Sequence, residues 1–125
     1  MRYYPITFII IACCTIFSSC KKEGIGGDFS IQGSVSHHDE KIANATIWVA
    51  FGATEFPGNS FDQYDLEINA DHQAAFSINE LYKGNYYLYG MGYDSLLQDS
   101  VFGGLRVAVN KNNSSPTINL AVTEN

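Results

Sequence analysis

Basic residues are scarce in this 125-residue sequence, and their scarcity limits its partners. The chain has 7 Lys and Arg against 13 Asp and Glu, which gives a formal net charge of −6 at pH 7. Nucleic acids and anionic lipid surfaces bind proteins through faces rich in positive charge. We therefore expect no nucleic-acid partner.

Cysteine is also rare. Cys13 and Cys14 lie inside one apolar run, and Cys20 follows it closely. If this run is removed from the mature protein, one thiol remains and no internal disulfide can form. About 100 residues then follow, which is enough for one domain with an adequate hydrophobic core.

The one long apolar run covers residues 6–17, ITFIIIACCTIF, and follows Arg2. A helix that remains in a bilayer needs about 20 apolar residues, so this run is too short for a permanent span. Its length is typical of the core of an export signal. The small residues Ser18 and Ser19 follow it, as they would at a cleavage point.

The segment Phe17-Ser18-Ser19-Cys20 resembles the bacterial lipobox, although Phe17 stands where an aliphatic residue is usual. The resemblance implies a lipoprotein signal over residues 1–19, a lipid on Cys20 and attachment to a membrane of the cell envelope. The expected location is the outer membrane of a Gram-negative bacterium. An ordinary secretory signal and an uncleaved anchor helix are the alternatives.

No window of helical length after Cys20 has a clear apolar stripe with a 3.6-residue period. Residues 20–28 are glycine-rich and predict a flexible tether, whereas residues 29–125 predict one domain. Within it, seven segments have apolar residues at every second position, which is typical of half-buried strands. This pattern predicts an all-β antiparallel sandwich of about seven strands. The expected strands cover residues 29–35, 45–51, 64–68, 74–78, 86–90, 105–109 and 118–122.

The order of these segments resembles the carboxypeptidase-regulatory-like, or transthyretin-like, β-sandwich family. The resemblance rests on Gly33, on NATIWV at residues 44–49, on the acidic turn and "F-x-I" strand at 71–78, and on LYKGNYYL at 81–88. It implies a Greek-key-type sandwich and often an accessory role, because this fold specifies function poorly. The family usually has glycine in the turn before the "F-x-I" strand. Here that turn reads DHQAA, so we expect a longer turn or a non-glycine residue at positive φ.

Residues with catalytic or metal-binding chemistry are sparse. His37-His38-Asp39-Glu40 is the densest group, but neighbouring residues of an extended chain point to opposite sides. We therefore interpret the group as a polar hairpin loop and expect no metal site and no cofactor. No nucleophile elbow is present, so we do not expect an enzyme.

Aromatic residues are the candidates for recognition. If Ile47 and Leu88 face the core, then Trp48, Tyr87, Tyr89 and Met91 share one outward face. Such a face suits a protein or glycan partner. The alternative is that the loop at residues 52–61 covers these side chains.

Two tripeptides, Asp94-Ser95-Leu96 and Asp99-Ser100-Val101, resemble an O-glycosylation sequon of exported bacterial proteins. They make Ser95 and Ser100 candidate O-glycosylation sites in what we predict to be a loop over residues 94–104.

The function that these patterns favour is a membrane-anchored, non-catalytic structural or binding module of the cell envelope. Two alternatives remain open. One is a small inhibitor or ligand-binding lipoprotein, and the other is a fimbrial-type subunit of a surface appendage.

Overall fold

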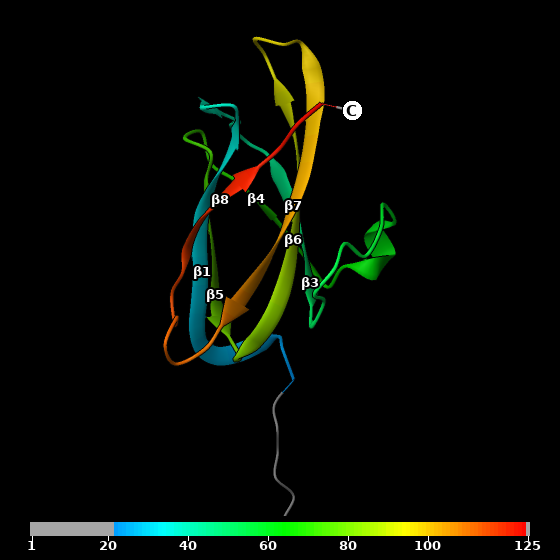
Figure 1. Ribbon diagram of the computed structural model, residues 1–125. Helices are drawn as coiled ribbons and strands as arrows, with labels where there is room; N and C mark the ends of the chain where they lie inside the picture. Colours follow the sequence, from blue (N-terminus) through cyan, green and yellow to red (C-terminus); the bar gives the residue numbers. More distant parts are fainter. Residues whose placement is uncertain (1–21, 125) are drawn as a thin grey trace, which may run out of the picture.

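A computed structural model describes residues 22–124, which form a β-sandwich of two sheets packed face to face (Figure 1). Residues 1–19 and Cys20 lie outside the described residues, so the signal and the lipid site remain predictions. No helix in the described part of the chain is long and apolar enough to cross a membrane. The two packed sheets confirm the predicted all-β sandwich.

Each sheet has four strands, and one 3₁₀ turn, η1 (Phe61–Gln63), lies in the loop between β3 and β4. The first sheet contains β1 (Ile25–His37), β2 (Glu40–Lys41), β5 (Ala75–Leu81) and β8 (Thr117–Ala121). The second sheet has the order β4-β3-β6-β7, with β3 (Thr46–Phe51), β4 (Leu66–Asn69), β6 (Gly84–Asp94) and β7 (Asp99–Val109).

All strand pairs are antiparallel except β1 with β8, which is parallel. The antiparallel sandwich is therefore as predicted except at this one parallel pair. The chain crosses from the second sheet to the first between β7 and β8, and β8 then runs in the same direction as its neighbour β1 (Figure 1). Strand periodicity gives no information about such a crossover, because side chains alternate with a two-residue period in parallel and in antiparallel strands alike.

Alternating side chains from both sheets form the core, as their period predicts. Burial of one large apolar side chain contributes roughly 1.5–3 kcal/mol. The fully buried large residues are Ile31, Val35, Ile42, Ile47, Val49, Leu81, Tyr86, Leu88, Val101, Val109 and Leu120.

The C-terminal strand closes one side of the sandwich over a pair of glycines. Gly90 and Gly103 are cross-strand neighbours, and a Cβ at Gly103 would lie 2.1 Å from the backbone oxygen of Ala121. Beyond β8, Thr123 and Phe102 exchange two backbone hydrogen bonds of 2.8 Å. The segment after β8 therefore joins the first sheet to β7.

The glycines also explain why the predicted loop over residues 94–104 is wrong. β6 continues to Asp94 and β7 begins at Asp99, so only residues 95–98 form the turn. Gly103 and Gly104 interrupt the apolar alternation of β7, and this interruption led to the prediction of a loop. A glycine is required at residue 103 because the C-terminal segment approaches the backbone of β7 closely there.

The turn before β5 has a non-glycine residue at positive φ, as predicted. Ala74 has a φ of 63°. Asp71 stabilises the turn because its Oδ1 accepts hydrogen bonds from the backbone N–H groups of Gln73 and Ala75, at 2.8 and 2.9 Å.

The predicted tether is too long by four residues, because β1 already begins at Ile25. The backbone just before it is fixed by Tyr86, whose hydroxyl accepts a 2.9 Å hydrogen bond from the N–H of Gly24. The same hydroxyl donates a 2.6 Å hydrogen bond to the carbonyl of Tyr82. The contact between Gly24 and Tyr86 links residues 62 positions apart in the sequence, and local composition, which predicted a tether, does not report such a contact.

Candidate functional site

The outward side of the second sheet carries the predicted aromatic residues. The register places Trp48 of β3 opposite Tyr89 of β6, with Tyr87 and Met91 at the neighbouring positions of β6. The ring centroids of Trp48 and Tyr89 are 6.2 Å apart. All four side chains therefore lie on one face, which we call the aromatic face.

The loop between β3 and β4 covers part of this face. Trp48 is only 7% exposed because the Phe61 ring stacks on it, with centroids 4.4 Å apart and planes 19° apart. Phe56 lies 5.1 Å from Tyr89 and 6.1 Å from Tyr87 between ring centroids. The rings that this part of the face exposes to solvent are therefore those of Phe56 and Phe61 in the loop, which are 47% and 53% exposed.

Polar contacts hold the loop on the aromatic face. The hydroxyl of Tyr64 donates a 2.8 Å hydrogen bond to the carbonyl of Gly58, and Asp65 accepts a 2.7 Å hydrogen bond from the N–H of Phe51. Burial raises the pKa of Tyr64 to about 12, helped by Tyr89 and Tyr87. The Tyr64 hydroxyl is therefore a neutral donor at physiological pH. In Figure 1 the loop with η1 lies on the side of β3 opposite β1 and β5.

Two shallow grooves border the Phe61 ring. One is lined by Asn59, Phe61, Tyr89, Met91 and Phe102. The other is lined by Trp48, Phe61, Tyr64, Asp65, Leu66 and Glu67. Each groove combines aromatic surface with hydrogen-bonding side chains, Asn59 on one side and Asp65 and Glu67 on the other. Such a surface can stack a planar or ring-shaped ligand and bind its polar edge.

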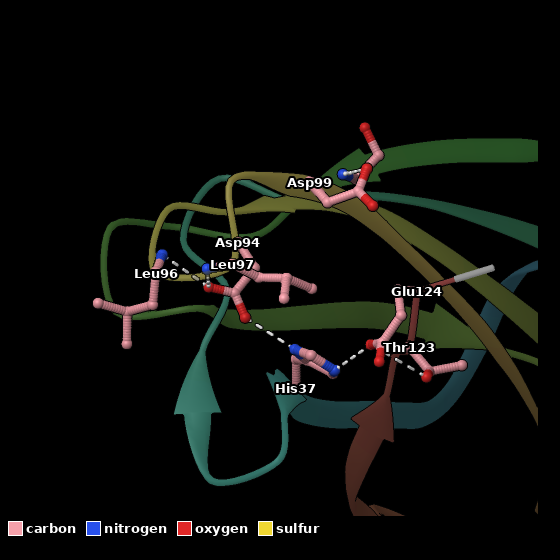
Figure 2. A network of polar contacts seen from close by, with 8 residues as sticks. His37, Asp94, Leu96, Leu97, Asp99, Thr123 and Glu124 are labelled. Atoms are coloured by element: carbon pink, nitrogen blue, oxygen red, sulfur yellow. Dashed lines mark hydrogen bonds and ion pairs between the residues drawn. The ribbon is translucent and has the colours of Figure 1, made fainter.

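A second cluster of functional groups lies at the opposite end of β1 from Ile25. His37 is 5% exposed, and its Nδ1 lies 2.7 Å from Oδ2 of Asp94 at the end of β6. Its Nε2 lies 2.6 Å from Oε2 of Glu124. Figure 2 shows the imidazole between these two carboxylates. The hydrogen bond that the Nδ1–H of His37 donates to Asp94 is the main cause that raises the pKa of His37, and the same bond is the main cause that lowers the pKa of Asp94.

The predicted polar hairpin at His37-His38-Asp39-Glu40 is confirmed, because β1 and β2 pair around a turn at residues 38–39. The argument that neighbouring side chains point to opposite sides does not hold at His38, because its φ of 46° departs from an extended chain. The two imidazole centroids are 4.3 Å apart. No sequence signal indicated Asp94 or Glu124 as partners, because the fold alone brings these distant residues to His37.

Both candidate glycosylation sites are exposed at the β6–β7 hairpin. Ser95 lies in the turn, which Asp94 holds through hydrogen bonds from the backbone N–H groups of Leu96 and Leu97. Ser100 lies near the start of β7. Glycosylation of either serine remains a prediction, and loss of a sugar mass on Ser95→Ala or Ser100→Ala would test it.

No protein-family model matches the chain, and no curated protein matches its sequence. Among solved structures, a variant of the major pilin subunit of Bacillus cereus aligns with a TM-score of 0.55 at 8% identity. The alignment covers 78% of this chain but only 30% of the pilin. A Pseudomonas aeruginosa protein that is proposed to bind carbohydrate aligns with a TM-score of 0.52 at 13% identity, over 78% of this chain and 90% of that one.

At these identities the similarity shows the β-sandwich fold and nothing finer. The carboxypeptidase-regulatory-like resemblance remains a prediction.

Proposed function

We propose that this chain is a lipid-anchored, non-catalytic binding module of the bacterial cell envelope, and that its aromatic face binds carbohydrate. The observation that carries the proposal is the pair of exposed rings, Phe56 and Phe61, beside grooves with polar side chains. Sugars present apolar C–H faces and hydroxyl edges, which match aromatic rings bordered by Asn59 and Glu67.

Two further features support this function. The Pseudomonas aeruginosa neighbour shares the fold over most of its length and is itself proposed to bind carbohydrate. The chain is also acidic, which suits a neutral glycan better than an anionic polymer.

The anchor would leave the binding residues accessible. The first described residues lie at one end of the sandwich, and the β6–β7 hairpin lies at the other end (Figure 1). A lipid on Cys20 would therefore place the hairpin away from the membrane, with the loop between β3 and β4 at the side.

Intact mass of the membrane-extracted protein tests the anchor. We expect a mature chain that starts at Cys20 with added acyl mass, and no acyl mass on a Cys20→Ser variant. An unmodified protein that is released from the membrane would contradict the anchor and would leave the carbohydrate proposal to be tested separately.

Fluorescence titration tests the aromatic face. Trp48 is the single tryptophan, and it lies under Phe61, so a ligand in either groove should change its emission. We would titrate a panel of neutral oligosaccharides and of peptidoglycan fragments, and confirm binding by calorimetry. Phe61→Ala and Phe56→Ala should abolish the calorimetric binding.

Leu96→Ala is the matched control, because Leu96 is also apolar and 74% exposed but lies on the β6–β7 turn. It should bind like the wild type. Equal loss of binding in this variant, or no saturable binding to any member of the panel, would contradict the carbohydrate proposal.

A further inference from the structure

Three metal-ligating side chains meet near the end of β1, away from the aromatic face. The donor atoms of His37, His38 and Glu124 all lie within 4.8 Å of one another. His37 is buried, whereas His38 and Glu124 are exposed. A depression lined partly by Ser36, His37, His38, Asp39 and Thr123 opens beside them.

His37 is oriented as a metal ligand would be. Its Nδ1 bonds to the carboxylate of Asp94, an arrangement that fixes the imidazole ring and leaves Nε2 to bind a cation. Nε2 is buried and makes no hydrogen bond of acceptable geometry, although Oε2 of Glu124 is 2.6 Å away. A lone pair on the imidazole nitrogen and a carboxylate oxygen repel each other at this separation, so either a proton or a metal cation must lie between them.

Small side-chain movements would complete the coordination. Ligands of one tetrahedral zinc ion are about 3.3 Å apart when each bond is about 2.0–2.1 Å long. Glu124 would therefore move outward by roughly 0.7 Å and His38 would move inward. Both side chains are exposed and can rotate, while packing and Asp94 hold His37 in place.

We propose that His37, His38 and Glu124 bind a zinc-class divalent cation, with Asp94 as the positioning residue of His37. Two imidazoles and one carboxylate favour Zn²⁺ over Ca²⁺ or Mg²⁺, which prefer oxygen ligands. The nearby Asp39 adds negative charge without any neutralising Lys or Arg among the residues that line the depression. Three protein ligands leave the remaining position for water or for a group from a partner.

The cation would also fasten the chain end that follows β8 to the end of β1. Glu124 follows the segment that closes the sandwich between β1 and β7. Binding should therefore reduce opening of this segment, and the amide of Thr123, which donates a 2.8 Å hydrogen bond to the carbonyl of Phe102, should exchange more slowly with solvent.

Calorimetric titration with Zn²⁺ tests the proposal. Thiolates also bind zinc, so the full chain would carry Cys13→Ser, Cys14→Ser and Cys20→Ser. A pH of about 8 reduces competition between protons and the metal for the ligands. We expect one saturable site that is weakened by His38→Ala and by Glu124→Gln, and slower amide exchange at Thr123 when zinc is bound.

His72→Ala is the matched control, because His72 is the third histidine and lies exposed in a different turn. It should bind zinc like the wild type, and Asp94→Asn should weaken binding by about 10- to 100-fold. Melting curves without zinc would show that each variant is folded. Absence of saturable binding, or equal weakening by His72→Ala, would overturn the site and would leave His37 as a protonated partner of two carboxylates.

Discussion

The Tyr86 hydroxyl offers a sharp test of how the described N-terminal residues are held on the sandwich. Tyr86→Phe removes one oxygen and leaves the shape of the buried ring unchanged. In the wild type, this oxygen accepts a hydrogen bond from Gly24 and donates one to Tyr82, at 2.9 and 2.6 Å. The side chain is 0% exposed, so water cannot easily replace it.

The loss of stability should be large for the removal of a single atom. A buried donor that is left without a partner costs about 1–3 kcal/mol, so the free energy of unfolding should fall by about that amount. For a domain of this size, each kcal/mol lowers the melting temperature by about 4–8 °C. Urea unfolding followed by circular dichroism would measure the change, with an unaltered m-value. The amide of Gly24 should also lose protection from exchange.

Tyr93→Phe is the control, because it makes the same chemical change on a side chain that is 58% exposed. It should unfold within about 0.5 kcal/mol of the wild type. Equal midpoints for Tyr86→Phe and the wild type would refute the reasoning, because the hydroxyl would then contribute nothing to docking of the strand.

Two other variants test the closing segment and the acidic turn. Gly103→Ala places a methyl group 2.1 Å from the backbone oxygen of Ala121, so we expect the free energy of unfolding in urea to fall by about 1–3 kcal/mol. An unchanged free energy of unfolding would mean that the C-terminal segment does not pack against Gly103. Hydrogen bonds from the backbone N–H groups of Ala75 and Gln73 lower the pKa of Asp71 below its usual value near 3.8. The ionised carboxylate therefore stabilises the fold at pH values above 3.8, and this stabilisation is lost as the pH falls through the lowered pKa. The stability advantage over Asp71→Ala should therefore be constant near neutral pH and shrink in acid, and a pH-independent difference would contradict this.

Much of the sandwich was predictable from local pattern. Alternation in segments such as residues 45–51 reports burial of one strand face, and every such segment overlaps a strand. The turn at residues 71–75 could also be predicted, because the absence of a glycine there suggested another residue at positive φ. Ala74 adopts that conformation. Alternation failed in β7, where Gly103 provides space for another strand rather than a side chain for the core.

The sequence by itself determined the strand periods, the outward face of Trp48 and the candidate signal before Cys20, because each depends on neighbouring residues. Only the tertiary structure decided that Phe61 covers Trp48, that β8 runs parallel to β1, and that Glu124 reaches His37. Those features depend on crossovers and loop paths, which local periodicity does not specify. The histidine–carboxylate cluster arises for the same reason: the backbone at His38 turns, and the chain end returns to it.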